Sequence, residues 1–373
     1  MLKRIYIDNF RCLVNFELDF DAINLFLGAN GSGKSTVFEV LQKIQAFVSG
    51  DSKVEGIFKD ADCTRWQISQ QIQRFELEII GNSGSYKYEL GIGHNRDKCR
   101  VDYERLWFDN QPLLKFELGE VQLYRDNHSE GPQYPFDWSQ SVLPSLMPRN
   151  DNTKLTWFRE RMARFIIIQV VPSLMVDDSN QEQMRLTPKM ANFVSWYRYL
   201  SEDQGKVAEI GNILRDVLDG FTNFKFERVS EDNLVLKLRF LGETDNIKPI
   251  EYRLGELSDG QKTLVALYTL IHGTKSEDYT LWIDEPENFL ALPEIQPWLI
   301  ELYDLCSDGK LQALLISHHP ELINYLLASP IGYWFERQSN AAVRVKRISH
   351  EVADNSGLPV SELIARGWLN ESA

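Results

Sequence analysis

Residues 28–35 read Gly28-Ala29-Asn30-Gly31-Ser32-Gly33-Lys34-Ser35, which is the spacing G-x-x-x-x-G-K-[ST] of a phosphate-binding loop. A glycine-rich turn lets successive backbone N–H groups point inward at phosphate oxygens, and a helix after the turn adds the positive end of its dipole. A short apolar stretch over 23–27 precedes the loop, and apolar residues at helical spacing follow it over 36–44. The sequence therefore predicts a strand, a phosphate-binding loop and a helix, in that order.

The loop also predicts individual contacts to a bound ATP and its Mg²⁺. Lys34 is expected to reach the β- and γ-phosphates, and the Ser35 hydroxyl is expected to ligate the metal. The residues of this segment expected to bind the nucleotide are Asn30, Gly31, Ser32, Gly33, Lys34, Ser35 and Thr36.

Composition limits the remaining possibilities. The chain has 373 residues, 43% of them hydrophobic, which is enough for a large core, and a net charge of −14. That charge disfavours a generally basic nucleic-acid binder and binding to anionic membranes, but it leaves a local basic groove open. No apolar run approaches 18 residues and the first residues alternate like a strand, so we expect no membrane segment, no leader and a cytoplasmic location.

Cysteine usage gives a further expectation. Four cysteines are spread along the chain without a C-x-x-C pair: Cys12, Cys63, Cys99 and Cys306. Such spacing is typical of a reducing compartment, and we expect neither a zinc site nor a disulfide framework.

The pattern of strands and helices divides the chain into three segments. Residues 1–137 contain the phosphate loop and then short alternating stretches separated by the turn-rich 81–85, which predicts antiparallel strands. Residues 138–250 are expected to be an inserted region of helices and strands. Residues 251–373 alternate helix with strand, as in a parallel α/β half. There are no sustained heptads and hence no long coiled coil.

Smaller stretches carry expectations of their own. Apolar residues fall at helical spacing from 192 to 218, and residues 234–240 alternate as a strand. Residues 127–153 are rich in Pro, Ser, Asp and Asn, so we expect a loop there.

A second chemical signal is the apolar strand 281–283, which ends in Asp284 and Glu285. A buried strand that ends in two carboxylates is costly unless the charges meet a cation or a reacting group. We expect Asp284 to hold Mg²⁺ opposite Ser35, and Glu285 to polarise an attacking water. The alternative is a strand end whose acids face solvent.

Two more stretches admit either a structural or a functional interpretation. Ser258 and Gln261 form an S-x-x-Q capping box before an apolar helix, and such a helix start is also an anion site. His318 follows the apolar stretch 311–315 and is placed to hydrogen-bond a γ-phosphate or orient a water. The alternatives are a simple helix cap and a surface histidine pair.

Taken in order, these stretches resemble the ABC-type ATPases, within them the RecF/SMC-like branch. The matching motifs are residues 9–12 (Asn-Phe-Arg-Cys), the Walker A loop 28–35, the signature 257–261, Walker B 281–287 and the switch-histidine loop 316–320. The resemblance implies an α/β fold: an ABC ATPase head of the P-loop NTPase type, with an antiparallel β region and an inserted helical lid. In these terms 1–137 and 251–373 are N- and C-terminal ATPase lobes, and 138–250 is the lid.

The resemblance also implies roles for particular residues. Heads of this kind form an ATP-sandwich homodimer in which Ser258 and Gly260 of one copy complete the nucleotide site of the other. Glu285 and His318 are the implied catalytic residues. Arg11 matches an arginine that touches the nucleotide, and Gln169 is the candidate for the glutamine that contacts the metal. Asp259 departs from the glycine of transporter-type signatures.

The expected function is Mg²⁺-dependent ATP hydrolysis that gates a DNA-linked or effector-linked response. The resemblance to ATPases of bacterial antiphage systems, in which a separate subunit carries the toxic chemistry, implies a separate effector or nuclease subunit. One alternative is a RecF-like repair clamp, in which DNA contacts a basic face; the candidates for that face are Arg159, Arg161, Arg164 and residues 344–347. Another is a slow-turnover nucleotide-binding scaffold.

Overall fold

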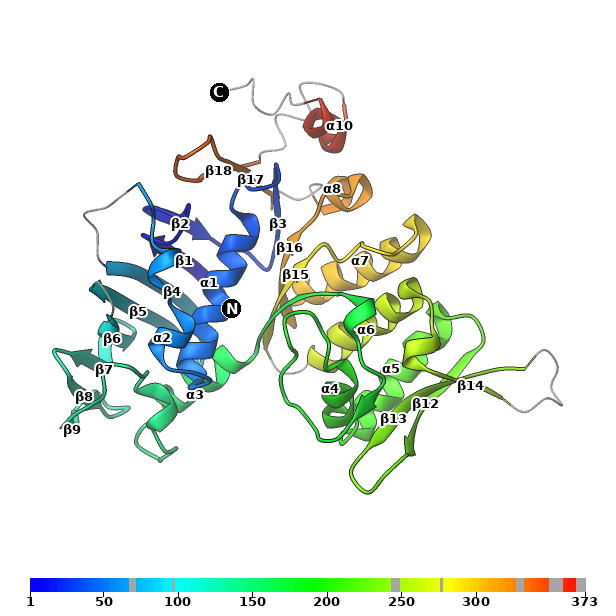
Figure 1. Ribbon diagram of the computed structural model, residues 1–373, viewed down its shortest axis with the longest axis horizontal. Coiled ribbons are helices and arrows are strands. Elements are labelled where there is room, and N and C mark those ends of the chain that lie inside the picture. The colour runs from blue at the N-terminus through cyan, green and yellow to red at the C-terminus, as the bar shows by residue number, and fades with distance from the viewer. Residues whose placement is uncertain are drawn as a thin grey trace. The chain divides into compact units, whose positions relative to one another are not determined.

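A computed structural model describes residues 1–66, 72–95, 98–242, 249–275, 278–326, 332–348 and 358–366. Its contacts divide the chain into two compact units (Figure 1). Unit 1 comprises Met1–Phe165 and Pro330–Ile348, and unit 2 comprises Ile166–Ser329 and Ser349–Ala373. The three segments expected from the sequence have other bounds, and that division stays a prediction.

Unit 1 contains an antiparallel sheet in the order β2-β1-β4-β5-β6-β7-β8-β9. Its strands are β1 (Leu2–Asp8), β2 (Phe16–Asp19), β4 (Ile72–Gly81), β5 (Gly84–Asn95), β6 (Lys98–Phe108), β7 (Gln111–Glu117), β8 (Glu120–Tyr124) and β9 (Glu130–Pro135). The expected hairpin is confirmed, since Gly81 pairs with Gly84. Asn82 and Ser83 between them both have positive φ, as the tight turns that match strand twist require.

The segment 127–153 is not entirely a loop, because β9 (Glu130–Pro135) lies within it. Pro132 and Pro135 cannot donate to a ladder, but β9 is an edge strand that, among the strands that the structure describes, pairs only with β8. Proline is tolerated in an edge strand. The proline-rich composition therefore predicted a loop at a place where the chain forms an edge strand.

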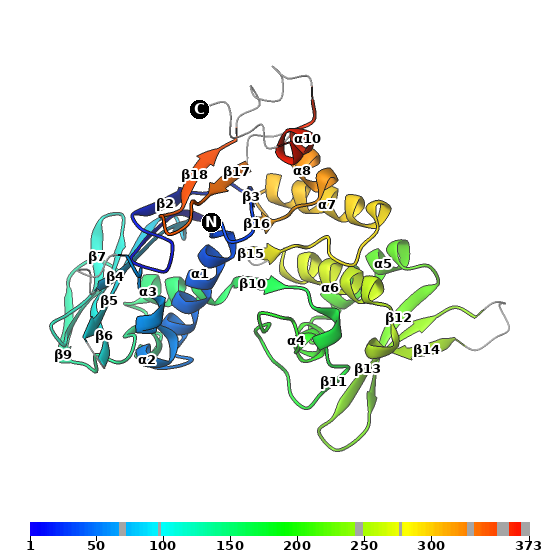
Figure 2. The ribbon, with the colours of Figure 1, turned by 45° about the horizontal axis from the view of Figure 1, so that its top comes forward.

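Helices of unit 1 cover one side of this sheet (Figures 1 and 2). They are α1 (Lys34–Ser49), α2 (Val54–Ile57) and α3 (Thr153–Ala163), with the 3₁₀ turns η1 (Asp60–Asp62) and η2 (Leu143–Ser145). Aromatic rings join the layers: Phe58 lies 5.3 Å from Phe75 of β4, and Phe158 lies 5.4 Å from Tyr88 of β5, between ring centroids. Phe58 also lies 6.0 Å from Phe47 of α1, and α3 contacts α1, so the sheet supports the helix that follows the phosphate loop through these neighbours.

The strand before that loop is β3 (Ile23–Gly28), all of whose residues are buried. It pairs in parallel with β17 (Gly332–Glu336), which pairs antiparallel with β18 (Arg344–Arg347). Phe26 of β3 packs against Phe335 and Phe38, with centroid distances of 4.9 and 6.0 Å. The predicted order of strand, loop and helix is confirmed, and an apolar core fixes the strand and helix on either side of the loop.

Unit 2 contains the parallel α/β half expected after residue 254. Strand β15 (Tyr279–Asp284) pairs in parallel with β16 (Leu311–Ile316), and β10 (Phe165–Gln169) is the other neighbour of β15. The accompanying helices are α6 (Asp259–Thr274), α7 (Leu292–Ser307), α8 (Pro320–Leu326) and α10 (Val360–Ala365), with the 3₁₀ turns η3 (Pro172–Leu174) and η4 (Leu254–Glu256).

A smaller antiparallel sheet with two helices makes up the rest of unit 2 (Figure 1). Its strands run β11 (Asp178–Ser179), β13 (Leu234–Phe240) and β12 (Phe221–Arg228), with β14 (Ile250–Arg253) also on β13. The predicted strand 234–240 is confirmed. The helical pattern over 192–218 is two helices, α4 (Phe193–Leu200) and α5 (Gln204–Val217), because Asp203 caps a new helix start by accepting from the N–H groups of Gly205 and Lys206.

Candidate nucleotide-binding site

The phosphate loop of unit 1 has a backbone that only glycine fits at two positions. A Cβ at Gly28 (φ 139°) would lie 2.3 Å from the carbonyl oxygen of Phe335, and one at Gly33 (φ 104°) would lie 2.6 Å from Val343 Cγ2. At Gly31 (φ 79°) a Cβ would meet no described atom within 4 Å. Gly28 and Gly33 therefore let the loop pack closely against neighbouring residues, and Gly31 leaves its backbone accessible to a ligand.

Two side chains of the loop fit a phosphate ligand. Lys34 is 6% exposed, and its Nζ donates to the carbonyl oxygens of Gly28 at 2.6 Å and Ala29 at 3.1 Å. The buried Ser32 Oγ has no hydrogen-bond partner among the described residues. A buried hydroxyl with no described partner and a lysine that donates to loop carbonyls are donors that anionic oxygens would satisfy.

Arg11 lies in unit 1 after β1 and close to the start of α1. Its guanidinium donates to Asp62 Oδ1 at 3.0 and 2.9 Å and to Glu39 Oε2 at 2.6 Å. The adjacent Cys12 Sγ lies 3.2 Å from an ideal Cβ at Gly33, so the Arg11 loop touches the phosphate loop. The Arg11 guanidinium thus lies near the loop and is hydrogen-bonded to two carboxylates. Its contact with a nucleotide stays a prediction.

Asp62 accepts hydrogen bonds from both Arg11 and Lys43. Burial disfavours its ionised form, but hydrogen bonds from Lys43 and Arg11 outweigh burial, and the net effect lowers the pKa of Asp62. Lys43 Nζ also lies 3.1 Å from Asp62 Oδ2. The two cations therefore keep this carboxylate ionised beside α1.

In unit 2, β15 carries the two carboxylates predicted at its end. Asp284 is the last residue of the strand and aligns with Ile316 of β16. Glu285 has a positive φ of 51°, which is uncommon outside glycine, and its N–H donates to Ile316 O at 2.9 Å. Asn288 Nδ2 donates to Glu285 Oε2 at 2.9 Å, which fixes the direction of that carboxylate.

Glu287 is the functional candidate that sequence reasoning missed. Its carboxylate is buried, and Oε1 accepts from Ser317 Oγ at 2.5 Å and from the N–H of His318 at 3.1 Å. The predicted switch residue His318 is itself exposed. Glu287 therefore connects the segment after β15 to the histidine loop. The sequence shows an acidic residue shortly after a buried strand, but its pattern does not reveal that Ser317 and His318 are the hydrogen-bond partners.

The signature segment joins the same part of unit 2. The predicted capping box is confirmed, since Ser258 Oγ accepts from Gln261 N at 3.2 Å and Gln261 Oε1 accepts from Ser258 N at 3.1 Å. A Cβ at Gly260 would lie 2.9 Å from Phe289 O, so the start of α6 packs closely on the segment after Glu285. The signature, the carboxylates and the histidine loop are thereby linked within one unit.

Gln169 ends β10 in unit 2, beside the strand that carries Asp284. Its Oε1 accepts from Lys189 Nζ, and its N–H donates to Pro188 O at 2.9 Å. A lysine on the amide oxygen occupies the atom that would ligate a cation, so a metal contact through Gln169 requires that lysine to move and stays a prediction.

One family matches most of the chain. Residues 23–324 match the family described as "AAA domain, putative AbiEii toxin, Type IV TA system". The chain belongs to this family. With the structural likeness below, membership of this AAA-domain family confirms the predicted ABC/SMC-like ATPase resemblance.

Two solved structures show the fold of this family member. The head of Smc bound to the C-terminal winged-helix domain of ScpA has a TM-score of 0.53 at 11% identity, covering 94% of this chain and 99% of that one. An Smc head with an extended coiled coil, bound to the C-terminal domain of ScpA derived from Pyrococcus furiosus, has a TM-score of 0.54 at 11% identity, covering 95% and 98%. The predicted α/β ATPase-head fold is confirmed.

A curated relative is a transporter-type protein. The "Putative ribose/galactose/methyl galactoside import ATP-binding protein 3" of Agrobacterium fabrum is 21% identical over 262 residues, which is 67% of this chain. The chain spans 49%, about half, of that relative's length. Among the helices that the structure describes, none is long and apolar enough to span a bilayer.

Proposed function

We propose that this family member binds ATP through its phosphate loop and hydrolyses it with Mg²⁺. The observation that carries the proposal is the loop itself: the buried Ser32 hydroxyl lacks a partner among the described residues, and Lys34 is held by two loop carbonyls. Both are donors in a backbone that Gly28 and Gly33 shape.

The predicted site residues are assigned distinct tasks in this proposal. Lys34 exchanges the carbonyl oxygens of Gly28 and Ala29 for phosphate oxygens, and Ser32 Oγ donates to one of them. Ser35 and Asp284 are the proposed ligands of Mg²⁺, which when bound would neutralise charge on the phosphates. Glu285, held by Asn288, accepts the proton of the attacking water.

His318 contacts the γ-phosphate, and Glu287 holds its backbone in place. Arg11 and Gln169 are secondary proposals, because each must first leave the partners it has in the structure.

We further propose that the complete site forms between two copies of the chain. Ser258 is exposed at the start of α6, where helix N–H groups favour an anion, and Gly260 allows close approach. Beside it, Phe289 is 54% exposed and Leu292 is 50% exposed. An exposed anion site next to exposed apolar side chains supports a contact with a second copy, in which Ser258 and Gly260 act on the partner's ATP.

The ATP cycle is proposed to control a separate effector subunit in antiphage defence. The support is the family description, which names a toxin of a toxin–antitoxin system. A basic DNA-binding face is less favoured. Arg161 is 0% exposed and lies 5.0 Å from the Phe165 ring, so it was wrongly placed among the DNA candidates.

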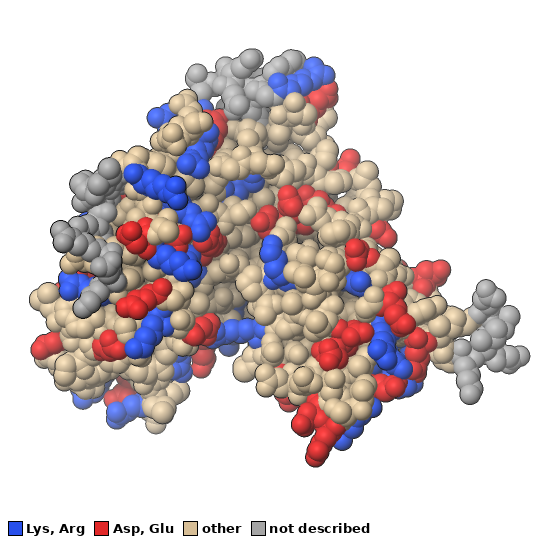
Figure 3. All heavy atoms as spheres, viewed as in Figure 1, with Lys and Arg blue, Asp and Glu red and all other residues tan. Residues whose placement is uncertain are grey.

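Two of the basic candidates on β18 (Arg344–Arg347) lie next to acids. On β18, Arg347 pairs with Asp21 at 2.5 Å and Lys346 lies 3.9 Å from Glu336. Figure 3 shows acidic and basic side chains interspersed on the face it draws. Interspersed charge favours a protein partner over a phosphate backbone.

The test of the ATPase is Mg²⁺-dependent phosphate release by wild type and Lys34→Ala. Losing the only side-chain cation in the loop is expected to weaken ATP binding and reduce turnover by about 100-fold or more. Lys53→Ala, which removes an exposed lysine of the same unit, is the control and should match wild type. Wild type that releases no phosphate, or Lys34→Ala that matches it, would refute the proposal.

A further inference from the structure

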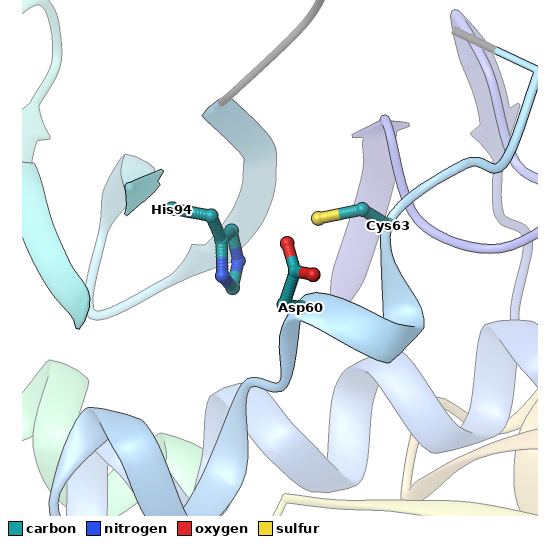
Figure 4. Close-up of side chains that lie close together, drawn as sticks. All are labelled: Asp60, Cys63 and His94. Carbon is teal, nitrogen blue, oxygen red and sulfur yellow. The ribbon is translucent and has the colours of Figure 1, made fainter. Parts of the chain in front are cut away.

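Three side chains with metal-binding chemistry meet in unit 1, away from the phosphate loop. Asp60 and Cys63 come from η1 and the residue that follows it, and His94 comes from the end of β5. One donor atom from each lies within 4.8 Å of the other two. Figure 4 shows the three side chains converging from separate elements.

The donor set identifies the class of ligand. A thiolate, an imidazole and a carboxylate are the ligands of zinc and similar divalent ions, whereas magnesium and calcium prefer oxygen alone. The spacing Asp60-x-x-Cys63 with a histidine from a distant strand has no C-x-x-C signature. The expectation of no zinc site rested on that missing signature.

His94 is prepared for a metal by a neighbour on the adjoining strand. It is 6% exposed, and its Nε2 lies 3.0 Å from Oε1 of Gln73, which is 0% exposed. An amide oxygen accepts the Nε2 proton and leaves Nδ1 as the basic nitrogen. A hydrogen bond from the far side of a ligating histidine is the usual support of such a ligand.

A second cysteine is paired with His94 across the sheet. Cys99 of β6 is the cross-strand partner of His94. Directly paired residues on antiparallel strands project to the same face, with Cβ atoms about 4.5–5.5 Å apart. Cys99 therefore stands beside His94, outside the cluster of three donors that lie within 4.8 Å of one another, and its thiol is the nearby group that could supply a fourth ligand.

We propose that Asp60, Cys63, His94 and Cys99 bind one zinc-class divalent ion. Four protein ligands leave no position for substrate, so the ion is structural. It joins η1 to the β5–β6 pair, two parts of unit 1 that are distant in sequence.

The test uses the full-length protein, purified without an affinity histidine tag and without chelators. We expect one zinc per chain by elemental analysis. Replacement by Co²⁺ should give near-ultraviolet thiolate charge-transfer absorption and the visible bands of a tetrahedral site.

Chelator competition should show zinc affinity lowered by about 100-fold or more in Cys63→Ser and His94→Gln, and by about 10–100-fold in Gln73→Leu. In Cys99→Ser the thiolate band should be about half as intense, because one of two sulfurs is lost.

Two controls separate binding from folding. Cys306→Ala removes a buried cysteine of unit 2 and should keep full zinc affinity. Zinc should raise the melting temperature of wild type by several degrees and leave that of folded Cys63→Ser unchanged. The proposed site would be overturned if wild type lacked stoichiometric zinc or a cobalt–thiolate band, or if Cys63→Ser kept the wild-type zinc affinity. If the band of Cys99→Ser were unchanged, Cys99 would not be one of the ligands. Lys34→Ala should bind zinc normally, which makes the result independent of ATP hydrolysis.

Discussion

The phosphate loop of unit 1 and the carboxylate cluster of unit 2 are built in different ways. The loop is one continuous segment, 28–35, whose shape depends on glycine backbone at close contacts. The cluster combines three separate segments, around Ser258, Glu285 and Ser317, held together by side-chain hydrogen bonds and one close backbone approach. The proposed role of the loop residues is therefore direct contact with a ligand, whereas several residues of the cluster hold others in place.

The largest effect in the cluster is expected where a residue acts directly. Glu285→Gln keeps the shape and the contact with Asn288 but removes the proton acceptor, so kcat should fall by about 10²–10⁴-fold with ATP binding retained. Phosphate release and nucleotide binding measure this. Asp308→Asn, an equivalent change at an exposed acid of unit 2, should match wild type. If Glu285→Gln hydrolysed ATP as fast as wild type, Glu285 would not be the group that accepts the proton of the attacking water.

A smaller effect is expected where a residue acts through its neighbours. Glu287→Gln weakens the contacts to Ser317 and His318, so we expect kcat to fall by about tenfold and stability by about 1–3 kcal/mol, the cost of an impaired buried hydrogen-bond pair. ATP affinity should not change, since Glu287 is proposed not to touch the nucleotide. Ser317→Ala should show a weaker form of the same pattern. A loss of stability without any change in kcat would make Glu287 purely structural.

Backbone contact is the next test of the cluster. Gly260→Ala places a Cβ 2.9 Å from Phe289 O, and relieving that overlap should cost about 1–3 kcal/mol and lower kcat several-fold. Gly211→Ala is the matched control, because the one described atom that its Cβ would approach within 4 Å is Arg215 Nη2, at 4.0 Å, in helix α5. There alanine should stabilise the protein by about 0.4–1 kcal/mol. Denaturant unfolding and turnover compare the two.

The smallest effect concerns the ion pairs beside the phosphate loop. The pKa of Asp62 is lowered in the folded state, so its contribution to stability is present above its unfolded value of about 4 and is lost as pH falls through the lower folded pKa. Wild type should therefore be more stable than Asp62→Asn at pH 7, and the difference should shrink below about pH 4. Urea unfolding at both pH values measures it, and a difference independent of pH would exclude this charge effect.

Local patterns predicted the local structures. The strand, loop and helix at 23–44, the hairpin at 81–85 and the capping box at Ser258 each depend on residues adjacent in sequence, and each is confirmed. The role of Glu287 and the convergence of Asp60, Cys63 and His94 depend on segments brought together by folding, which no spacing rule records. Asp203 shows the intermediate case, since one capping residue divided a continuous helical pattern into two helices.

The composite site is tested most directly by the mass in solution of the Glu285→Gln protein, measured with and without Mg·ATP. We predict one chain without nucleotide and two chains with it, because hydrolysis no longer separates the copies. Glu285→Gln combined with Ser258→Arg should bind ATP and remain a single chain. A Glu285→Gln protein that binds ATP without any change in mass would contradict a site completed by a second copy.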